Sequence, residues 1–125
     1  EESTVIASLV KKGCNDKLLS VWGDGTPIRD FIHAEDVARG ILMSYENEIT
    51  EPINLGSGDG VRIKDIASIV ATHYGKEIEY DTTKPNGDNK RLMDMTRANS
   101  YGFHPQVDLE TGIKRVIKYY ESLQK

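Results

Sequence analysis

The sequence predicts a small α/β domain made of about four helices and several short strands. Apolar residues recur at helical spacing in four stretches, and short apolar or alternating runs lie between them. This interleaving is typical of α/β folds, but the strands are too short and scattered for a complete doubly wound sheet. We therefore expect residues 1–125 to form one domain that covers a larger neighbour and has no such sheet of its own.

The first half of the chain predicts a helix, two strands and a second helix. Apolar spacing from residue 5 to 12 ends in two lysines, whose charge suits a helix C-terminus. Residues 18–22 predict a short strand that stops at a glycine turn, and residues 28–33 alternate as a second strand. Glu35 and Asp36 begin the next helix. Its apolar stripe consists of Val37, Ala38, Ile41, Leu42 and Tyr45.

The next part adds two strands, a helix and a loop. Residues 52–55 predict a strand, and residues 63–74 predict a helix with Gly75 as its left-handed C-terminal residue. Residues 77–80 predict another strand. The polar stretch 81–90 contains proline and glycine and therefore predicts a surface loop.

The end of the chain predicts an extended segment and a last helix. Residues 91–95 are expected to be extended. Pro105 precedes a helix that Asp108 can cap through its side chain. The residues of this helix that face inward are Leu109, Ile113, Val116, Ile117 and Tyr120.

Composition excludes several classes of protein. Hydrophobic residues at 38% and charged residues at 29% are ordinary for a globular domain and argue against a disordered tail. No apolar stretch approaches the roughly 20 residues of a membrane helix, and no signal peptide opens the chain. The net charge of −4 comes from interleaved acids and bases, which form no basic face for a nucleic acid. With one cysteine, we expect a cytoplasmic protein without nucleic-acid or membrane partners.

The histidines and the cysteine do not follow a metal-binding pattern. His33, His73 and His104 are far apart in the sequence, and Cys14 has neither a second cysteine nor an obvious base beside it. We expect no metal site in this chain.

The run Gly56-Ser57-Gly58-Asp59-Gly60 allows two interpretations. It follows a predicted strand and precedes a helix, as a phosphate-binding loop does. However, its spacing differs from a dinucleotide fingerprint, and no Lys-Ser or Lys-Thr pair follows it. We predict a plain turn and no cofactor site here.

The segment from Val21 to Asp36 offers the residues of a nucleotide clamp. Trp22 provides a flat apolar face for a base or ribose, and Arg29 provides a planar fork that fits phosphate oxygens. The alternatives stay open: Trp22 as core filler, and Arg29 as the partner of a local acid.

Four segments resemble the extended short-chain dehydrogenases/reductases, the NAD-dependent epimerase/dehydratase family, and among them most the GDP-L-fucose synthases. Residues 21–36 carry Gly-x-Gly, Arg-x-Phe and then Asp in the family's order, and residues 53–58 resemble its Asn-x-Gly-x-Gly strand end. Residues 84–94 resemble a Lys-Pro-Asp-Gly segment followed by paired basic residues and Asp. Residues 102–113 resemble the family's Gly-aromatic-x-Pro and Leu-Glu-x-Gly-Leu close. The resemblance runs from about Ser3 to about Tyr120.

The resemblance implies a site for the diphosphate and base of a GDP- or UDP-sugar. Val21 and Trp22 would line the nucleotide pocket, and Arg29 would hold the diphosphate. Further basic groups would lie near the phosphates or the sugar, where two negative charges need pairing. These are Lys12, Lys90 and Arg91. For the two lysines, an ordinary solvated position is the alternative.

The chain departs from the family in its catalytic residues. The family's glycine-rich cofactor loop and its Tyr-x-x-x-Lys pair are not expected in these residues, so we assign no catalytic residue and no NAD or NADP site to them. Thr4 stands where the synthases carry a proton-transferring His, and threonine cannot replace imidazole in that role. The parent enzyme would then be a reductase, dehydratase or 4-epimerase of a related sugar nucleotide. Arg62 stands where the family caps a helix with Ser or Thr.

Two hypotheses follow for the whole protein. In the first, an N-terminal Rossmann domain outside these residues binds NAD(P) and carries out the chemistry, and this domain binds the nucleotide sugar. In the second, the domain is a stand-alone, non-catalytic binding or regulatory module. The initial Glu1 favours a fragment, and an exposed partner face predicts self-association into a homo-oligomer.

Overall fold

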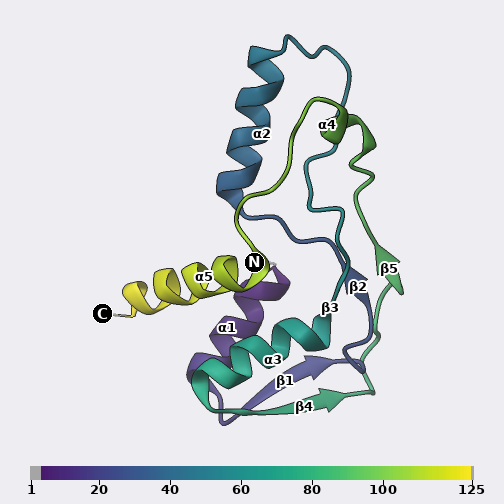
Figure 1. Ribbon diagram of the computed structural model, residues 1–125. Helices are drawn as coiled ribbons and strands as arrows, with labels where there is room; N and C mark the ends of the chain where they lie inside the picture. Colours follow the sequence, from purple (N-terminus) through teal and green to yellow (C-terminus); the bar gives the residue numbers. More distant parts are fainter. Residues whose placement is uncertain (1–3, 125) are drawn as a thin grey trace.

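Five helices and five short strands follow one another in the described part of the chain, residues 4–124 of a computed structural model (Figure 1). The predicted α/β class is confirmed. Ser3, from which the family resemblance was drawn, lies outside the described residues together with residues 1, 2 and 125. In chain order the elements are α1 (Val5–Asn15), β1 (Leu18–Trp22), β2 (Ile28–Arg29), α2 (Ala34–Glu46), β3 (Val61–Arg62), α3 (Ile63–Tyr74), β4 (Glu77–Asp81), β5 (Lys90–Arg91), α4 (Thr96–Ser100) and α5 (Leu109–Leu123).

The strands form two small sheets. β1 and β4 pair in parallel over five residues each. β2 lies between β3, which is antiparallel to it, and β5, which is parallel, so that Arg29 is the register partner of Arg91. Neither sheet is a doubly wound sheet, as the short strand patterns predicted.

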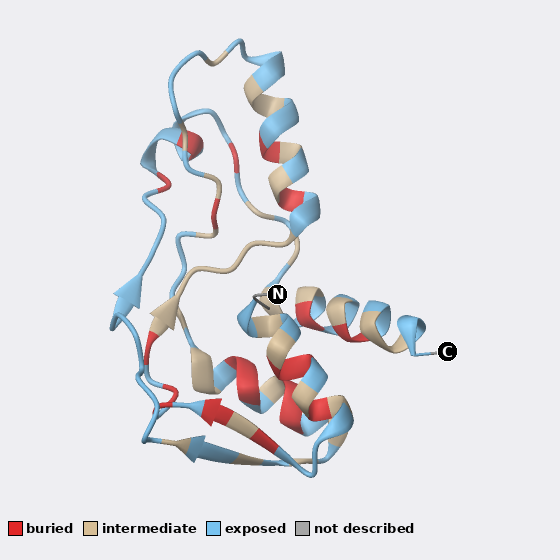
Figure 2. Ribbon diagram, turned by 180° about the vertical axis from the view of Figure 1, so that it is seen from behind, coloured by how far each residue is buried: buried red, intermediate tan, exposed pale blue. Residues whose placement is uncertain are grey.

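One hydrophobic core lies where α1, α3 and α5 meet β1 (Figure 2). We call α1, β1, α3, β4 and α5 the body. Leu19 and Val21 alternate inward from β1, and each helix supplies an apolar stripe at helical spacing. Each buried aliphatic side chain contributes about 1.5–3 kcal/mol relative to exposure. The core residues are Leu9, Val10, Leu19, Val21, Ile66, Ala67, Val70, Ile113 and Ile117.

The helix ends of the body follow the sequence predictions. The Asp108 carboxylate accepts from the Thr111 amide at 2.7 Å and caps α5. Gly75 ends α3 in the left-handed conformation, with φ 63°, which glycine adopts without strain. Arg62 precedes α3 without a side-chain cap, as its side chain predicts.

A second, smaller cluster lies in what we call the arm, residues 34–58 and 92–106, which contain α2 and α4. Its buried apolar residues are Met95, Ala98 and Phe103. Within the arm, α2 packs closely against Leu55 at Gly40, where a Cβ atom would lie 2.6 Å from the Leu55 side chain. α2 and α4 extend away from the body in Figure 1.

The apolar stripe predicted for α2 is largely exposed in the structure. Ile41, Leu42 and Tyr45 are 61%, 56% and 82% exposed. The pattern is amphipathic, but within residues 4–124 no other element covers this face. None of the helices in this range is long and apolar enough to cross a membrane.

Two strand predictions are wrong. The second strand covers only Ile28–Arg29, because Asp30 turns away to bind the loop at residues 57–58. Residues 52–55 form no strand, because no other backbone segment of the described chain forms ladder hydrogen bonds with them. Of residues 91–95, which were expected to be extended, only Arg91 belongs to a strand, β5 (Lys90–Arg91), and the short helix α4 was not predicted.

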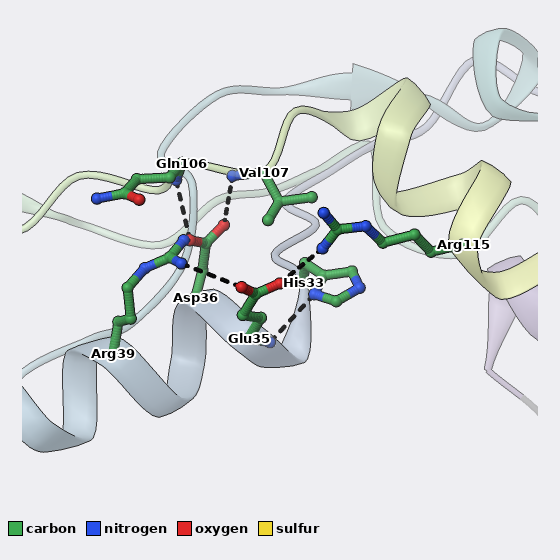
Figure 3. Close-up of polar contacts among 7 residues, drawn as sticks. All are labelled: His33, Glu35, Asp36, Arg39, Gln106, Val107 and Arg115. Atoms are coloured by element: carbon green, nitrogen blue, oxygen red, sulfur yellow. Dashed lines mark hydrogen bonds and ion pairs between the residues drawn. The ribbon is translucent and has the colours of Figure 1, made fainter.

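A buried carboxylate joins α2 to residues 106–107, which lead from the arm into the body. The side chain of Asp36 is 0% exposed, and its two oxygens accept from the amides of Gln106 at 2.9 Å and Val107 at 3.0 Å (Figure 3). Arg39 also binds this carboxylate. Three donors around one buried charge fix the first turn of α2 beside the segment that leads into α5.

Two outer contacts support this fastening. The Nδ1 atom of His33 accepts from the amide of Glu35 at 3.1 Å and caps α2. The Glu35 carboxylate accepts from Arg115 of α5 at 2.6 Å (Figure 3). Both contacts are exposed, so they are weaker than the buried one.

Candidate functional site

A pocket of about 550 Å³ lies at the end of β1, between α1 and the loop that follows β4. Four of the six predicted site residues line it: Lys12, Val21, Trp22 and Arg29. They come from α1, β1 and β2, so the fold gathers residues that are up to 17 positions apart in the sequence. The other lining residues are Val5, Ser8, Leu9, Ser20, Ile63, Pro85 and Asn86.

These additional lining residues were not identified from the sequence, although helical spacing pointed to three of them. Val5, Ser8 and Leu9 share one helical face with Lys12, because residues three, four and seven positions apart face the same side. Pro85 and Asn86 belong to the loop after β4, whose fold over β1 is set by the pairing of β1 with β4.

Trp22 is a surface residue and not core filler. Its side chain is 58% exposed, which rules out the alternative that it fills the core. The Nζ atom of Lys84 lies 5.4 Å from the centroid of its ring, within reach of a cation–π contact. An exposed indole beside a pocket offers a stacking surface to a planar ligand.

Arg29 is held by carbonyl oxygens and not by an acid. Its Nη1 atom donates to the carbonyls of Ile28 at 2.9 Å and Asp88 at 2.7 Å. Among the ion pairs of residues 4–124 none includes Arg29, so the alternative of a local acidic partner does not describe it. The guanidinium therefore keeps a positive charge that an anion in the pocket can neutralise.

Lys12 is half-buried, unlike a solvated surface lysine. Its Nζ atom donates to the carbonyl oxygen of Ser20 at 3.0 Å, at the edge of β1. That contact uses one of its three donors and aims the ammonium group along the pocket wall.

Lys90 and Arg91 lie on β5, exposed and outside the residues that line the pocket. β5 runs beside β2, so these two residues are neighbours of Ile28 and Arg29 in the sheet. Arg91 already pairs with Asp88, with Nη2 and Oδ2 2.6 Å apart. Their predicted contact with a ligand stays a prediction, and an ordinary solvated position suits Lys90.

The glycine run at residues 56–60 is organised around the carboxylate of Asp30. Asp30 accepts from the amides of Ser57 and Gly58, both at 2.7 Å, and from the amide of Met93 at 3.2 Å. Burial acts to raise the pKa of Asp30, but these hydrogen bonds outweigh it and hold the pKa below its ordinary value of 3.8. Because Asp30 occupies these amides, this loop does not fit the pyrophosphate of a dinucleotide.

The sequence contains one Tyr-x-x-x-Lys spacing. Tyr80 and Lys84 stand four residues apart, so the expectation that the Tyr-x-x-x-Lys spacing does not occur is wrong. Tyr80 lies on β4 and Lys84 follows a turn closed by its own amide on the Asp81 carbonyl, whereas helical residues at this spacing would share one face. Lys84 lies over Trp22 instead.

Thr4 caps a helix, and the histidines belong to no metal-binding group in the described residues. The Thr4 hydroxyl accepts from the Ala7 amide at 3.4 Å and caps α1, a role that threonine suits. Within residues 4–124, His, Cys, Asp and Glu side chains form no group of three that could hold a metal ion.

A larger pocket, of about 600 Å³, lies in the arm but offers less to an anion. Its lining includes Asn54, Asp94 and Arg97. Arg97 already donates to the Pro52 carbonyl at 2.6 Å and lies 3.6 Å from a Glu51 oxygen. The Asp94 carboxylate adds a negative charge, so we regard the pocket at Trp22 as the candidate site.

Known proteins are similar to this chain over nearly its whole length. A family model described as the NAD dependent epimerase/dehydratase family matches residues 1–56. The GDP-L-fucose synthase of Sinorhizobium fredii is 38% identical over 129 residues, which cover 96% of this chain and 40% of that protein. Residues 1–56 thus resemble the NAD-dependent epimerase/dehydratase family, and nearly the whole chain is similar to GDP-L-fucose synthases.

Further relatives show how much of their own length this chain covers. GDP-L-fucose synthase 1 of Arabidopsis thaliana is 32% identical, covering 96% of the chain and 40% of that protein. The structure of UDP-glucose 4-epimerase of Thermotoga maritima with UDP-glucose superposes with a TM-score of 0.84 at 26% identity. It covers 100% of this chain and 41% of that one. The chain thus spans about two fifths of the relatives it matches.

Proposed function

We propose that this chain binds the nucleotide-diphosphate half of the substrate in an NAD(P)-dependent nucleotide-sugar epimerase, reductase or dehydratase. The observation that carries the proposal is the meeting of Lys12, Trp22 and Arg29 around one pocket. These are two cations and an indole from three different elements. The Thermotoga maritima relative, solved with UDP-glucose, supports this substrate class.

Each of these side chains supplies a different part of the recognition. The Arg29 guanidinium offers paired donors to the oxygens of a diphosphate, and Lys12 adds a second positive charge from α1. Trp22 offers its ring to the base or ribose. Two negative charges entering a half-buried pocket need this compensation.

We assign the redox chemistry to a cofactor-binding domain outside these residues. The glycine run at residues 56–60 is filled by Asp30 and does not fit a cofactor pyrophosphate. The exposed face of α2 and the unpaired residues 52–55 favour a neighbouring domain that covers the arm. This chain then contributes binding and orientation of the sugar nucleotide to the reaction.

Calorimetric titration of the full-length protein with GDP-, UDP- and dTDP-sugars tests the assignment. Arg29→Ala should weaken binding of the preferred sugar nucleotide roughly 10- to 100-fold, as expected for a lost charge-assisted hydrogen-bond pair. Arg62→Ala removes an exposed arginine from the neighbouring strand, outside the pocket, and should leave affinity unchanged. Equal affinity for the Arg29→Ala variant and the natural protein would refute the clamp.

The same protein separates the enzyme from a non-catalytic binding module. The module hypothesis predicts the same binding isotherm but no conversion of the preferred sugar nucleotide when NAD or NADP, oxidised or reduced, is supplied. The enzyme hypothesis predicts turnover of the sugar.

A further inference from the structure

Asn86 and Gly87 form a chemically labile pair at the edge of the pocket. Of the asparagines in the sequence, Asn86 is the one followed by glycine. Glycine has no side chain to hinder the attack of its own peptide nitrogen on the preceding side-chain amide. Both residues are exposed, in the loop between β4 and β5.

The surroundings of Asn86 favour this attack. Its Oδ1 atom accepts from the Asp24 amide at 2.8 Å, so a donor is already in place where negative charge develops on that oxygen. In residues 4–124 the Gly87 amide has no hydrogen-bond partner, so the attacking nitrogen is free. Gly87 has φ 79°, a conformation that suits glycine.

We propose that Asn86 is a site of spontaneous deamidation, and that its product releases the loop 81–90 from the turn at Gly23–Gly25. The Gly87 nitrogen forms a bond to Cγ of Asn86, and the side-chain nitrogen leaves as ammonia with the proton from Gly87. Water then opens the cyclic imide at either carbonyl, giving aspartate or isoaspartate. No oxidant or reductant takes part.

The release follows from a change of charge beside Asp24. The Asn86 side chain lies beside Asp24, because its Oδ1 atom accepts from the Asp24 amide at 2.8 Å. The pKa of Asp24 is lowered mainly by hydrogen bonds from Thr26, and the Asn86 side chain adds to this effect. A carboxylate at position 86 would face the carboxylate of Asp24 and repel it. The same loop carries Lys84, which lies over Trp22, so its release uncovers the ring.

Mass spectrometry of the aged protein tests the chemical step. After incubation at mildly alkaline pH, the peptide that contains Asn86 should convert to an acidic pair of products, while peptides with the other asparagines stay unchanged. Asn86→Gln should suppress the conversion, because its longer side chain would have to close a larger ring. If Asn86 keeps its amide as long as the other asparagines do, the proposal is wrong.

Quenching of the single tryptophan tests the loop release, and it does not depend on the proposed substrate. Asn86→Asp should raise the acrylamide quenching of Trp22 about twofold at low salt and return it towards the natural value at roughly 1 M salt. The neutral Asn86→Gln variant should show no such salt dependence. Identical, salt-independent quenching in Asn86→Asp and Asn86→Gln would overturn the release.

Discussion

The body and the arm contain similar apolar patterns but differ in how far the patterns are buried. In the body, the stripes of α1, α3 and α5 converge on one core with β1. In the arm, α2 carries an equally amphipathic pattern, yet Ile41, Leu42 and Tyr45 are exposed. An apolar stripe in the sequence therefore indicates that one face of a helix is suited to burial. Only the structure shows whether the described chain covers that face.

The body and the arm also have different roles in the proposed enzyme. The body supplies α1 and β1 to the walls of the candidate site. The arm has little core of its own and is fastened through Asp36, so its unburied face is free to meet another domain. Four changes can break or sharpen this comparison.

The largest expected difference is between a core residue of the body and an exposed one of the arm. Ile66→Ala should reduce the free energy of unfolding by about 2–5 kcal/mol, because it leaves a cavity at a fully buried position. Leu42→Ala should change it by less than about 0.5 kcal/mol. Urea denaturation measures both, and similar losses would contradict the division into body and arm.

A local effect of intermediate size is expected at the fastening. Asp36→Ala should cost about 3 kcal/mol, because it leaves the amides of Gln106 and Val107 and the Arg39 guanidinium without their partner. Hydrogen exchange should rise in α2 and at residues 106–107 while α1 and α3 stay protected. Uniform exchange throughout the chain would show that the arm is not a separate unit.

Acid should weaken the link between the arm and β2. Because folding lowers the pKa of Asp30, its carboxylate stabilises the fold above the ordinary value of 3.8, and this stability is lost as the pH falls through the lower folded value. Asp30→Asn should lower stability at neutral pH and flatten its decline towards acid. Denaturation curves recorded from neutral to acid pH measure both effects. If stability declined towards acid as steeply in Asp30→Asn as in the natural protein, the role of Asp30 would be refuted.

The smallest change in stability, but a clear change in assembly, is expected on the exposed face of α2. Ile41→Ser combined with Leu42→Ser should leave unfolding nearly unchanged and abolish self-association of the 125-residue chain. Sedimentation velocity measures the association. If the unmodified chain sediments as a monomer at high concentration, the exposed face of α2 does not drive self-association.

The sequence predicted the body well because its signals are local. Helical spacing and caps at Asp108 and Gly75 specify where α3 and α5 begin or end, and the structure agrees. The strand of residues 52–55 was predicted wrongly because pairing depends on a distant backbone, which no local pattern reveals.

The candidate site was predicted in part for a similar reason. Trp22, Arg29 and Lys12 stand out by their chemistry, and the fold brings them to one pocket. Lys90 stands out equally, yet β5 leaves it outside that pocket. Conversely, Asn86 lines the pocket only because β4 pairs with β1. Nothing about an asparagine at this position predicts that location.

The indole N–H resonance of Trp22 tests the central claim most directly, because this residue is the only tryptophan of the chain. In a titration with UDP-glucose or a GDP-sugar followed by ¹H–¹⁵N NMR, we expect this resonance and the amides of Val21 and Arg29 to shift together and saturate. Shifts confined to Asn54 and Thr96, in the pocket of the arm, would contradict the assignment.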